Sequence, residues 1–390
     1  MKLKFLSMLA VAALVFTGCS SDDDSGNNTT TPTDENLAGN MTESRTLDAD
    51  VNYKLTGALI VKDGVTLTIP AGTTIEAIAG GTGVYLLVER GGKIVANGTP
   101  DSPITFTSNA ATPKAGDWGG VIINGRAPIS RQANGANEAA TEINTAVLFG
   151  GDIATDNSGI LNYVVIEYTG ARIDDDAEHN GLTLNGVGSG TTLSNIMIKN
   201  GDDDAIEFFG GTVNASNILV VNCTDDMFDF SQGYTGTVTN IYGIREAGYT
   251  AVTADPRGVE ADGNLDGVSP TDINQSNFTI NGMTIINKGA FTAPTMVDVI
   301  KIRRGATATI TNAYVEFGSG VSVTGVDMID LKDAAGDAND ATKITFTRNA
   351  ANSLGTTAIK NTTTGGATTT ENTSQTGATT APFAWTSYAF

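Results

Sequence analysis

The sequence predicts an all-β parallel β-helix, a solenoid whose rungs repeat about every 22–30 residues. Three observations predict this fold: short apolar runs, Gly, Asn or Asp residues that interrupt every run, and a repeat in the middle of the chain. The chain has 46 Gly and only 6% aromatic residues, a composition that favours strands and tight turns over helical bundles. Its hydrophobic fraction of 40% is enough for a sizeable core.

The repeat is clearest between residues 194 and 241. Ser194-Asn195-Ile196 recurs as Ser216-Asn217-Ile218 after 22 residues, and as Thr239-Asn240-Ile241 after 23 more. One such repeat cannot bury its apolar side alone, whereas repeats stacked about 4.8 Å apart share a continuous core. The Leu-x-x-Leu-x-Leu-x-x-Asn spacing of a leucine-rich repeat is absent, which disfavours that solenoid. A β-sandwich is the other alternative.

The chain divides into four predicted segments. Residues 1–18 are typical of a secretory signal, because two lysines precede an apolar run that is too short to span a bilayer comfortably. Residues 19–46 are acidic and Thr-rich and are expected to form a flexible tether. The β-helix is expected over 47–350. Residues 351–390 form a Thr/Gly-rich segment whose aromatic end is expected to pack on the body.

The signal ends in Phe16-Thr17-Gly18-Cys19, which resembles the lipobox of bacterial lipoproteins. Cys19 is therefore the expected site of lipidation, and palmitate is expected among its acyl chains. The alternative is an ordinary cleaved signal with an incidental cysteine. The acids at 22–24 resemble an export tag that carries lipoproteins to the outer leaflet, so we expect an outer-membrane protein that faces the cell exterior. A solvated acidic linker is the alternative. A lipidated Cys19 would leave Cys223 without a disulfide partner.

The charge balance excludes one class of partner. The formal net charge is -21, and nucleic acid is a poor partner for such a chain because phosphate binding depends on clustered Lys and Arg. The single histidine, His179, excludes His-rich metal sites. It lies in an inserted loop and is expected to be exposed.

Several motifs carry a resemblance to a known family. They are the runs 67–75 (LTIPAGTTI), 103–108 (PITFTS), 116–121 (GDWGGV) and 206–212 (IEFFGGT). With these motifs the chain resembles lipid-anchored, right-handed parallel β-helix proteins of Gram-negative bacteria, which have a pectate-lyase-like fold. The resemblance implies a right-handed helix and a surface address. It implies no reaction, because the family has no established activity.

The repeat stacks acidic residues on neighbouring rungs. The three pairs are Asp203 over Asp225, Asp204 over Asp226, and Glu207 over Asp229. Like charges about 5 Å apart repel one another unless a cation or hydrogen-bond donors intervene. Clusters of carboxylate oxygens suit Ca²⁺, which takes 6–8 oxygen ligands. The alternative is that these carboxylates cap turns and lie in water.

A second candidate for Ca²⁺ binding is the loop that contains Asp262, Asn264 and Asp266. These residues match the first half of a calcium loop, D-x-[DN]-x-[DN]-G. The match then fails, because Ile273 occupies the twelfth position. A metal-free loop rich in Asp and Asn is the alternative.

The strand 299–304 carries the most basic spot of the body. Strand alternation places Lys301 and Arg303 on one outer face, where either is a weak candidate for the base of a calcium-dependent polysaccharide lyase. The alternative is charge pairing with acidic neighbours. The scarcity of bases favours a binding or structural module for a glycan or a surface protein. A polysaccharide lyase or glycoside hydrolase that acts on acidic polysaccharide is the second hypothesis.

Overall fold

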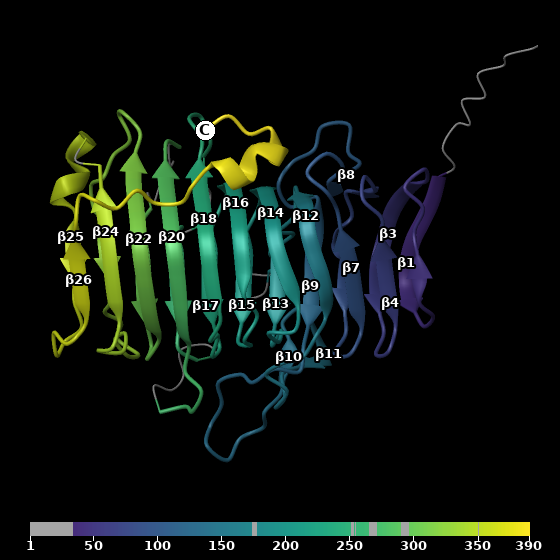
Figure 1. Ribbon diagram of the computed structural model, residues 1–390, viewed down its shortest axis with the longest axis horizontal. Helices are drawn as coiled ribbons and strands as arrows, with labels where there is room; N and C mark the ends of the chain where they lie inside the picture. Colours follow the sequence, from purple (N-terminus) through teal and green to yellow (C-terminus); the bar gives the residue numbers. More distant parts are fainter. Residues whose placement is uncertain are drawn as a thin grey trace, which may run out of the picture. The chain divides into compact units, whose positions relative to one another are not determined.

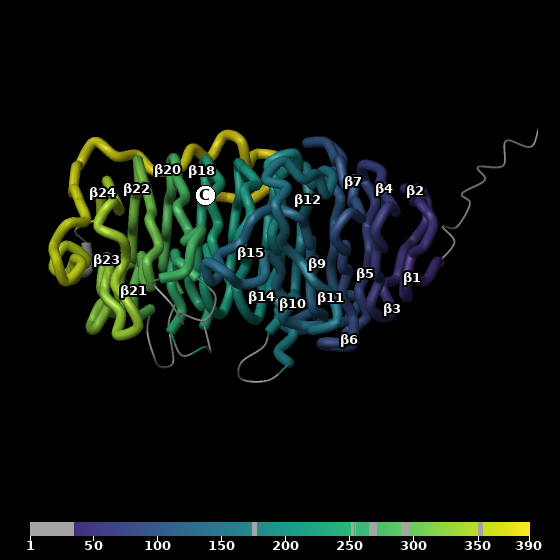
Figure 2. Tube along the Cα trace, turned by 90° about the horizontal axis from the view of Figure 1, so that it is seen from below, coloured from purple at the N-terminus to yellow at the C-terminus, as the bar shows by residue number. Residues whose placement is uncertain are grey.

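The structure is a computed structural model that describes residues 34–173, 178–250, 253, 255–264, 271–289, 296–349 and 351–390. Nearly all of its strands pair in parallel, each with the strand one rung earlier and one rung later. Figure 1 shows the strands side by side along the long axis of the body, and Figure 2 shows the successive turns of the chain stacked from purple to yellow. The predicted parallel β-helix is confirmed.

Each rung contributes strands to three faces, and the first face carries the acidic residues. It begins with the ends of β1 (Asp34–Met41) and β3 (Asn52–Val61). It continues, in order, with β6 (Gly81–Val88), β9 (Trp118–Asn124), β13 (Leu182–Asn185), β15 (Ile206–Phe209), β17 (Phe228–Ser231), β19 (Val259–Asp262), β21 (Asp298–Arg303), β23 (Asp327–Asp330) and β25 (Ala358–Lys360).

The second and third faces share long strands that bend at a corner. At the N-terminal end the two faces are separate strands: β2 (Arg45–Thr46), β4 (Thr66–Ile69) and β7 (Lys93–Asn97) on the second face, and β5 (Thr74–Ala77) and β8 (Ile104–Ser108) on the third. From β12 onward one strand serves both: β12 (Gly159–Glu167), β14 (Thr192–Gly201), β16 (Ala215–Cys223), β18 (Thr237–Arg245), β20 (Asn277–Asn287), β22 (Thr307–Phe317), β24 (Lys343–Arg348) and β26 (Thr368–Glu371).

The repeated asparagine turns the corner within these long strands. Asn195, Asn217 and Asn240 have φ values of 53°, 55° and 59°, in the left-handed region that Asn tolerates better than most residues. Their side chains form a ladder, since Asn217 donates to Asn195 over 3.0 Å and Asn240 donates to Asn217 over 2.9 Å. The tripeptide repeat seen in the sequence is therefore the signature of this corner.

Alternation along each strand separates a buried core from the outer surface. On the first face, every second residue points into the solenoid, where Phe208 and Phe230 stack 5.1 Å apart, and Phe278 of β20 stacks on Phe230 at 4.4 Å. Trp118 is also fully buried and donates from Nε1 to the carbonyl of Glu167 over 2.8 Å. The residues between them face outward and form the candidate site.

The solenoid extends beyond the expected limits of 47–350 at both ends. Strands β1 and β2 lie within the segment expected to be a tether, where Leu37 is buried, and the buried Leu47 directly follows β2. These two leucines stand among polar residues, so no apolar period marks the strands in the sequence. At the other end the 3-10 helix η2 (Ala351–Thr356), β25 and β26 continue the rungs to residue 371.

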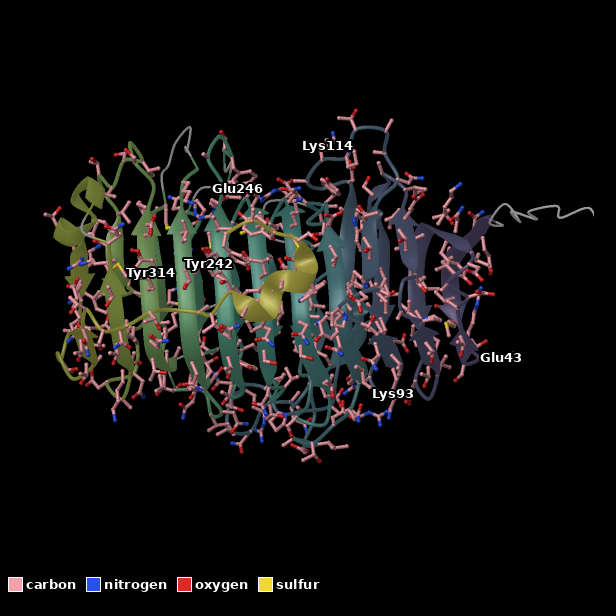
Figure 3. All side chains as sticks on the ribbon, turned by 45° about the horizontal axis from the view of Figure 1, so that its top comes forward. Glu43, Lys93, Lys114, Tyr242, Glu246 and Tyr314 are labelled. Atoms are coloured by element: carbon pink, nitrogen blue, oxygen red, sulfur yellow. The ribbon has the colours of Figure 1, made fainter. Side chains whose placement is uncertain are left out.

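The last residues return along the third face, and we call 376–390 the strap. Its backbone bonds to three earlier rungs: Thr376 N donates to Asn312 (2.7 Å), Ala378 N to Thr284 (2.9 Å) and Thr379 N to Asn240 (2.7 Å). The 3-10 helix η3 (Ala381–Thr386) then buries Phe383 against the third face. Figure 3 shows the strap crossing the strands near the labelled Tyr314, Tyr242 and Glu246.

Candidate functional site: an acidic cleft on the first face

The first face carries a row of outward side chains, one from each rung, which we call the outer row. The strand register aligns Thr183, Glu207, Asp229, Glu260, Lys301, Asp330 and Lys360 in that order. Charges alternate in sign from Glu260 to Lys360. Glu207, Asp229 and Glu260, in contrast, are three carboxylates in succession. The row is therefore balanced at its C-terminal end and strongly negative in its middle.

A cleft of about 340 Å³ opens over this negative part of the outer row. Among the described residues that line it, eleven are carboxylates and three are arginines. The carboxylates are Glu142, Glu178, Asp203, Asp204, Glu207, Asp225, Asp226, Asp229, Asp255, Glu260 and Asp262, and the arginines are Arg257, Arg303 and Arg304. All six residues of the predicted stacked pairs thus line one cleft.

Two of the aspartates bind backbone groups of the next rung. Asp204 Oδ1 accepts a hydrogen bond from the backbone N–H of Asp226 over 2.8 Å, and Asp226 Oδ1 accepts one from the backbone N–H of Arg257 over 2.6 Å. These bonds explain why Asp recurs two residues before the strand in successive rungs. Each bond satisfies one oxygen of the carboxylate, but a neutral N–H group does not balance its negative charge.

Asp229 differs from its neighbour Glu260 because its buried oxygen has neither a hydrogen bond nor an ion pair with the described residues, whereas the buried Oε1 of Glu260 pairs with Arg303. The residue is only 9% exposed, and Oδ1 accepts no hydrogen bond from the described residues. Glu207 on the preceding rung receives neutral donors, Asn180 Nδ2 at 2.6 Å and Ser231 Oγ at 3.3 Å. Burial, followed by the nearby Glu207 and Glu260 charges, raises the pKa of Asp229 well above its usual value.

The same causes act on the rest of the cluster. Burial is the largest cause in each case and neighbouring carboxylates add to it, so the pKa values of Asp203, Asp204, Glu207 and Asp226 are all raised well above normal. Burial and the charge of Asp255 raise the pKa of Asp225 to about 6. The cleft therefore disfavours its own ionised form unless positive charge enters it.

The three arginines that line the cleft neutralise its C-terminal side, while Arg172 lies 3.6 Å from Glu178 and 3.5 Å from Asp203 at the other side. Arg257 pairs with Glu260 and lies 3.7 Å from Asp226, while Arg303 pairs with Glu260 and with Asp262 at 3.1 Å. Lys301 Nζ donates to Asp330 over 2.9 Å and to the carbonyl of Lys332 over 2.8 Å. Lys301 and Arg303 do lie on the outer face, but both are held in ion pairs, a poor state for a catalytic base.

Within the part of the chain that the structure describes, four groups of three carboxylates have oxygens within 4.8 Å of one another. They are Asp203, Asp204 and Asp225; Asp204, Glu207 and Asp229; Asp226, Asp229 and Glu260; and Asp298, Asp327 and Asp330. Lys301 and Lys360 pair with the last group, Arg257 pairs with the third, and Arg172 pairs with Asp203 of the first. The second group is the one in which the described residues place no ion pair. It could hold a cation through carboxylate oxygens.

The loop at Asp262 has a different character. Its carboxylate lies between Arg303 and Arg304, at 3.1 and 3.3 Å, so its charge is already neutralised. Asn264 donates to the carbonyl of Arg304 over 3.0 Å and so faces the same arginines. Asp266, the third residue of the motif, lies outside the described residues.

His179 is not exposed as its sequence position suggested. It is 1% exposed, its ring lies 5.2 Å from that of Tyr85, and Nε2 lies 3.2 Å from the carbonyl oxygen of Thr82. Burial lowers its pKa to about 4, so the imidazole is neutral at pH 7. His179 therefore packs within the body and does not face solvent.

A larger hollow of about 660 Å³ lies beside the hairpin formed by β10 (Ala139–Thr141) and β11 (Asn144–Phe149). Its arginines are paired, Arg90 with Glu138 at 3.1 Å and Arg126 with Asp63 at 3.0 Å. It has no excess of one charge comparable to that of the acidic cleft. The cleft, and not the larger hollow, is therefore the candidate site.

Comparison with known families is consistent with this architecture. The family model of the pectate-lyase-like β-helix domain matches residues 39–389, almost the whole chain. The chain belongs to this family. No curated protein and no solved structure matches it. Among the described residues, no helix has the length and apolar character needed to cross a membrane.

In this pectate-lyase-like chain, sequence analysis missed Glu142, Arg257 and Glu260. Glu260 follows Asp229 in the outer row, but it lies 31 residues later in the sequence, beyond the spacing of 22–23 that revealed the repeat. The long connection between the two strands hid the alignment. The only signal was the alternation Val259-Glu260-Ala261-Asp262, which places two acids on one face.

The raised pKa values predict how stability depends on pH. A carboxyl such as Asp225, with a pKa of about 6 in the folded state and an ordinary value of 3.8, holds its proton more tightly in the folded state. Its contribution to stability is fully present below pH 3.8 and is lost as the pH rises through about 6. In EDTA, we expect the urea concentration at the unfolding midpoint to decrease as the pH is raised from 4 to 7. The Asp225→Asn variant should show a smaller decrease. A midpoint that rises over this interval would contradict the assignment.

Proposed function

We propose that the acidic cleft binds a divalent cation, Ca²⁺ by its preference for carboxylate oxygens, and uses it to hold an acidic glycan. The observation that carries this proposal is the buried, unpartnered Oδ1 of Asp229, in a group with Asp204 and Glu207 that has only neutral donors. A cation there would satisfy the oxygen and offset the mutual repulsion. Its remaining coordination positions would be open to carboxylate or hydroxyl oxygens of a sugar.

The C-terminal half of the outer row supports this interpretation. Where carboxylates recur at Asp330, the neighbouring rungs supply Lys301 and Lys360, so the protein provides its own cations. At Asp229 the neighbouring rungs supply Glu207 and Glu260 instead. A row that is neutralised in one half and left negative in the other is suited to take its missing charge from solution.

Catalysis is the second candidate, and the geometry favours hydrolysis over elimination. A lyase needs a free base, whereas Lys301 and Arg303 are held in ion pairs. A glycoside hydrolase needs a carboxyl kept protonated near neutral pH and a second, ionised carboxylate. The raised pKa of Asp225, about 6, suits the first role.

One experiment separates these functions. Purified protein should be retarded in native gels that contain polygalacturonate or alginate when Ca²⁺ is present and should migrate freely with EDTA or in dextran. We expect no absorbance near 235 nm, the signature of elimination, after incubation with either polymer. New reducing ends without that absorbance would favour the hydrolase. Failure of both polymers to retard the protein would refute glycan binding.

We further propose that the body is displayed on the cell surface through a lipid on Cys19, with the glycan or a surface protein as its partner. The support is the lipobox-like run that ends at Cys19 and the acids behind it. Protease treatment of intact cells should release the body, and Cys19→Ala should leave the protein soluble. Digestion only after cell lysis would place the protein in the periplasm.

A further inference from the structure

One aromatic side chain lines the cleft among the described residues, and it interrupts a polar row. Two positions beyond the outer row, the register aligns Asn185, Phe209 and Ser231 on successive rungs. Phe209 is partly exposed and forms part of the cleft wall, next to the carboxylates of the outer row. The exposed part of an apolar ring in a wall of carboxylates is in contact with water, and it is removed from water only when a ligand covers it.

The hairpin β10–β11 supports this ring from one side. Phe149, which is buried, lies with its ring centroid 6.4 Å from that of Phe209 at an interplanar angle of 59°. Asn124 anchors the hairpin, since Nδ2 donates to Thr141 Oγ1 over 2.7 Å, and Asn185 in turn donates to Asn124 over 2.9 Å. Phe209 is thus positioned by packing and a buried amide pair, as a preformed recognition surface requires.

We propose that Phe209 is the stacking platform for a sugar ring of the acidic polysaccharide bound in the cleft. The inference rests on the proposed function and adds a specificity-determining residue to it. A uronate ring has an apolar C–H face as well as polar edges. Phe209 would contact the C–H face, while the cation held by the Asp204, Glu207 and Asp229 group would bind the oxygens at the edge.

The test compares Phe209→Leu, Phe209→Ala and Phe209→Tyr with the wild-type protein in native gels that contain polygalacturonate or alginate and Ca²⁺. Leu keeps apolar volume against Phe149 but has no flat face, and Tyr keeps the face. We expect Leu and Ala to weaken retardation about three- to tenfold and Tyr to retain it. Phe390→Ala, at an aromatic on the third face, is the matched control and should bind as wild type.

The outcomes distinguish the two proposals. A second measurement, the melting temperature with and without Ca²⁺ in the absence of polymer, reports binding of the cation alone. We expect Ca²⁺ to raise the melting temperature of every Phe209 variant as it does for the wild-type protein. Wild-type retardation by Phe209→Leu would overturn the platform and leave glycan binding intact. If neither polymer retards the wild-type protein, glycan binding fails, and the platform fails with it. A variant that loses both retardation and the Ca²⁺ response would show that Phe209 acts on the cation group, which also overturns the platform.

Discussion

Millimolar Ca²⁺ is expected to raise the melting temperature of the protein, and EDTA is expected to reverse the rise. A ligand that binds only the folded state stabilises it by about 2.7 kcal/mol at 100 times its dissociation constant. For a body of this size, such a gain corresponds to a rise of a few degrees, about 2–4 °C. The measurement is a thermal scan followed by circular dichroism, with and without Ca²⁺.

Asp229→Asn locates this effect. The amide has nearly the shape of the carboxylate but carries no charge, so it should remove most of the Ca²⁺ response and raise the stability of the protein in EDTA. The stability gain follows because Asn removes a buried charge between Glu207 and Glu260.

The matched control is Asp330→Asn, at the equivalent position of the outer row. Burial alone would raise the pKa of Asp330, but the hydrogen bond from Lys301 outweighs it and the pKa is lowered. Removing this charge should destabilise the protein, because Lys301 loses its partner, and should leave the Ca²⁺ response intact. A full Ca²⁺ response in Asp229→Asn would exclude the cation from the Asp204, Glu207 and Asp229 group.

Phe383→Ala is expected to lower the free energy of unfolding by about 3–4 kcal/mol, the usual cost of truncating a buried phenylalanine. The ring is fully buried, packs in one cluster with Leu219 and Val221 and meets Tyr242 edge to face at 6.4 Å. Its loss should release the strap and expose this apolar surface. Urea unfolding gives the energy, and limited proteolysis should show early cleavage within 376–390.

The control for this variant lies in the same segment. Phe390 is 47% exposed, so Phe390→Ala removes the same type of side chain from a site that buries only about half of it and should cost clearly less than Phe383→Ala. Equal losses in the two variants would mean that the strap is held by its backbone hydrogen bonds rather than by Phe383.

Much of the fold could be predicted because the residues that repeat in the sequence are the same residues that form the corner and the strand pairs of each rung. Asn195 and Asn217 turn the corner, and the pairing of Glu207 with Asp229 follows from the same spacing of 22 residues. The first rung could not be found in this way, because only Leu37 and Leu47 mark its buried side. Local pattern is informative where rungs are regular, and it fails where a rung is short of apolar residues.

The charge pattern of the site was only half visible in the sequence. Acids close in sequence were aligned correctly, whereas the arginines that neutralise part of the cleft come from a rung that follows a long connection. Arg303 reaches Glu260 through pairing of β19 with β21, which no local spacing encodes, whereas Arg257 lies only three residues before Glu260. Whether a positive side chain neutralises a stacked carboxylate therefore depends on which rungs become neighbours in the folded protein.

The strap has a practical consequence for anyone who handles this protein. The chain ends on the middle of the solenoid and not at its tip, since Tyr388 donates to Glu246 over 3.1 Å and Trp385 lies against Tyr163 with ring centroids 5.4 Å apart. An affinity tag or fusion partner added after Phe390 would thus press on the central rungs. The tip that follows β25 and β26 tolerates no simple extension either, because the polypeptide leaves it to form the strap. Reporter domains are better placed ahead of β1, where the chain enters the first rung.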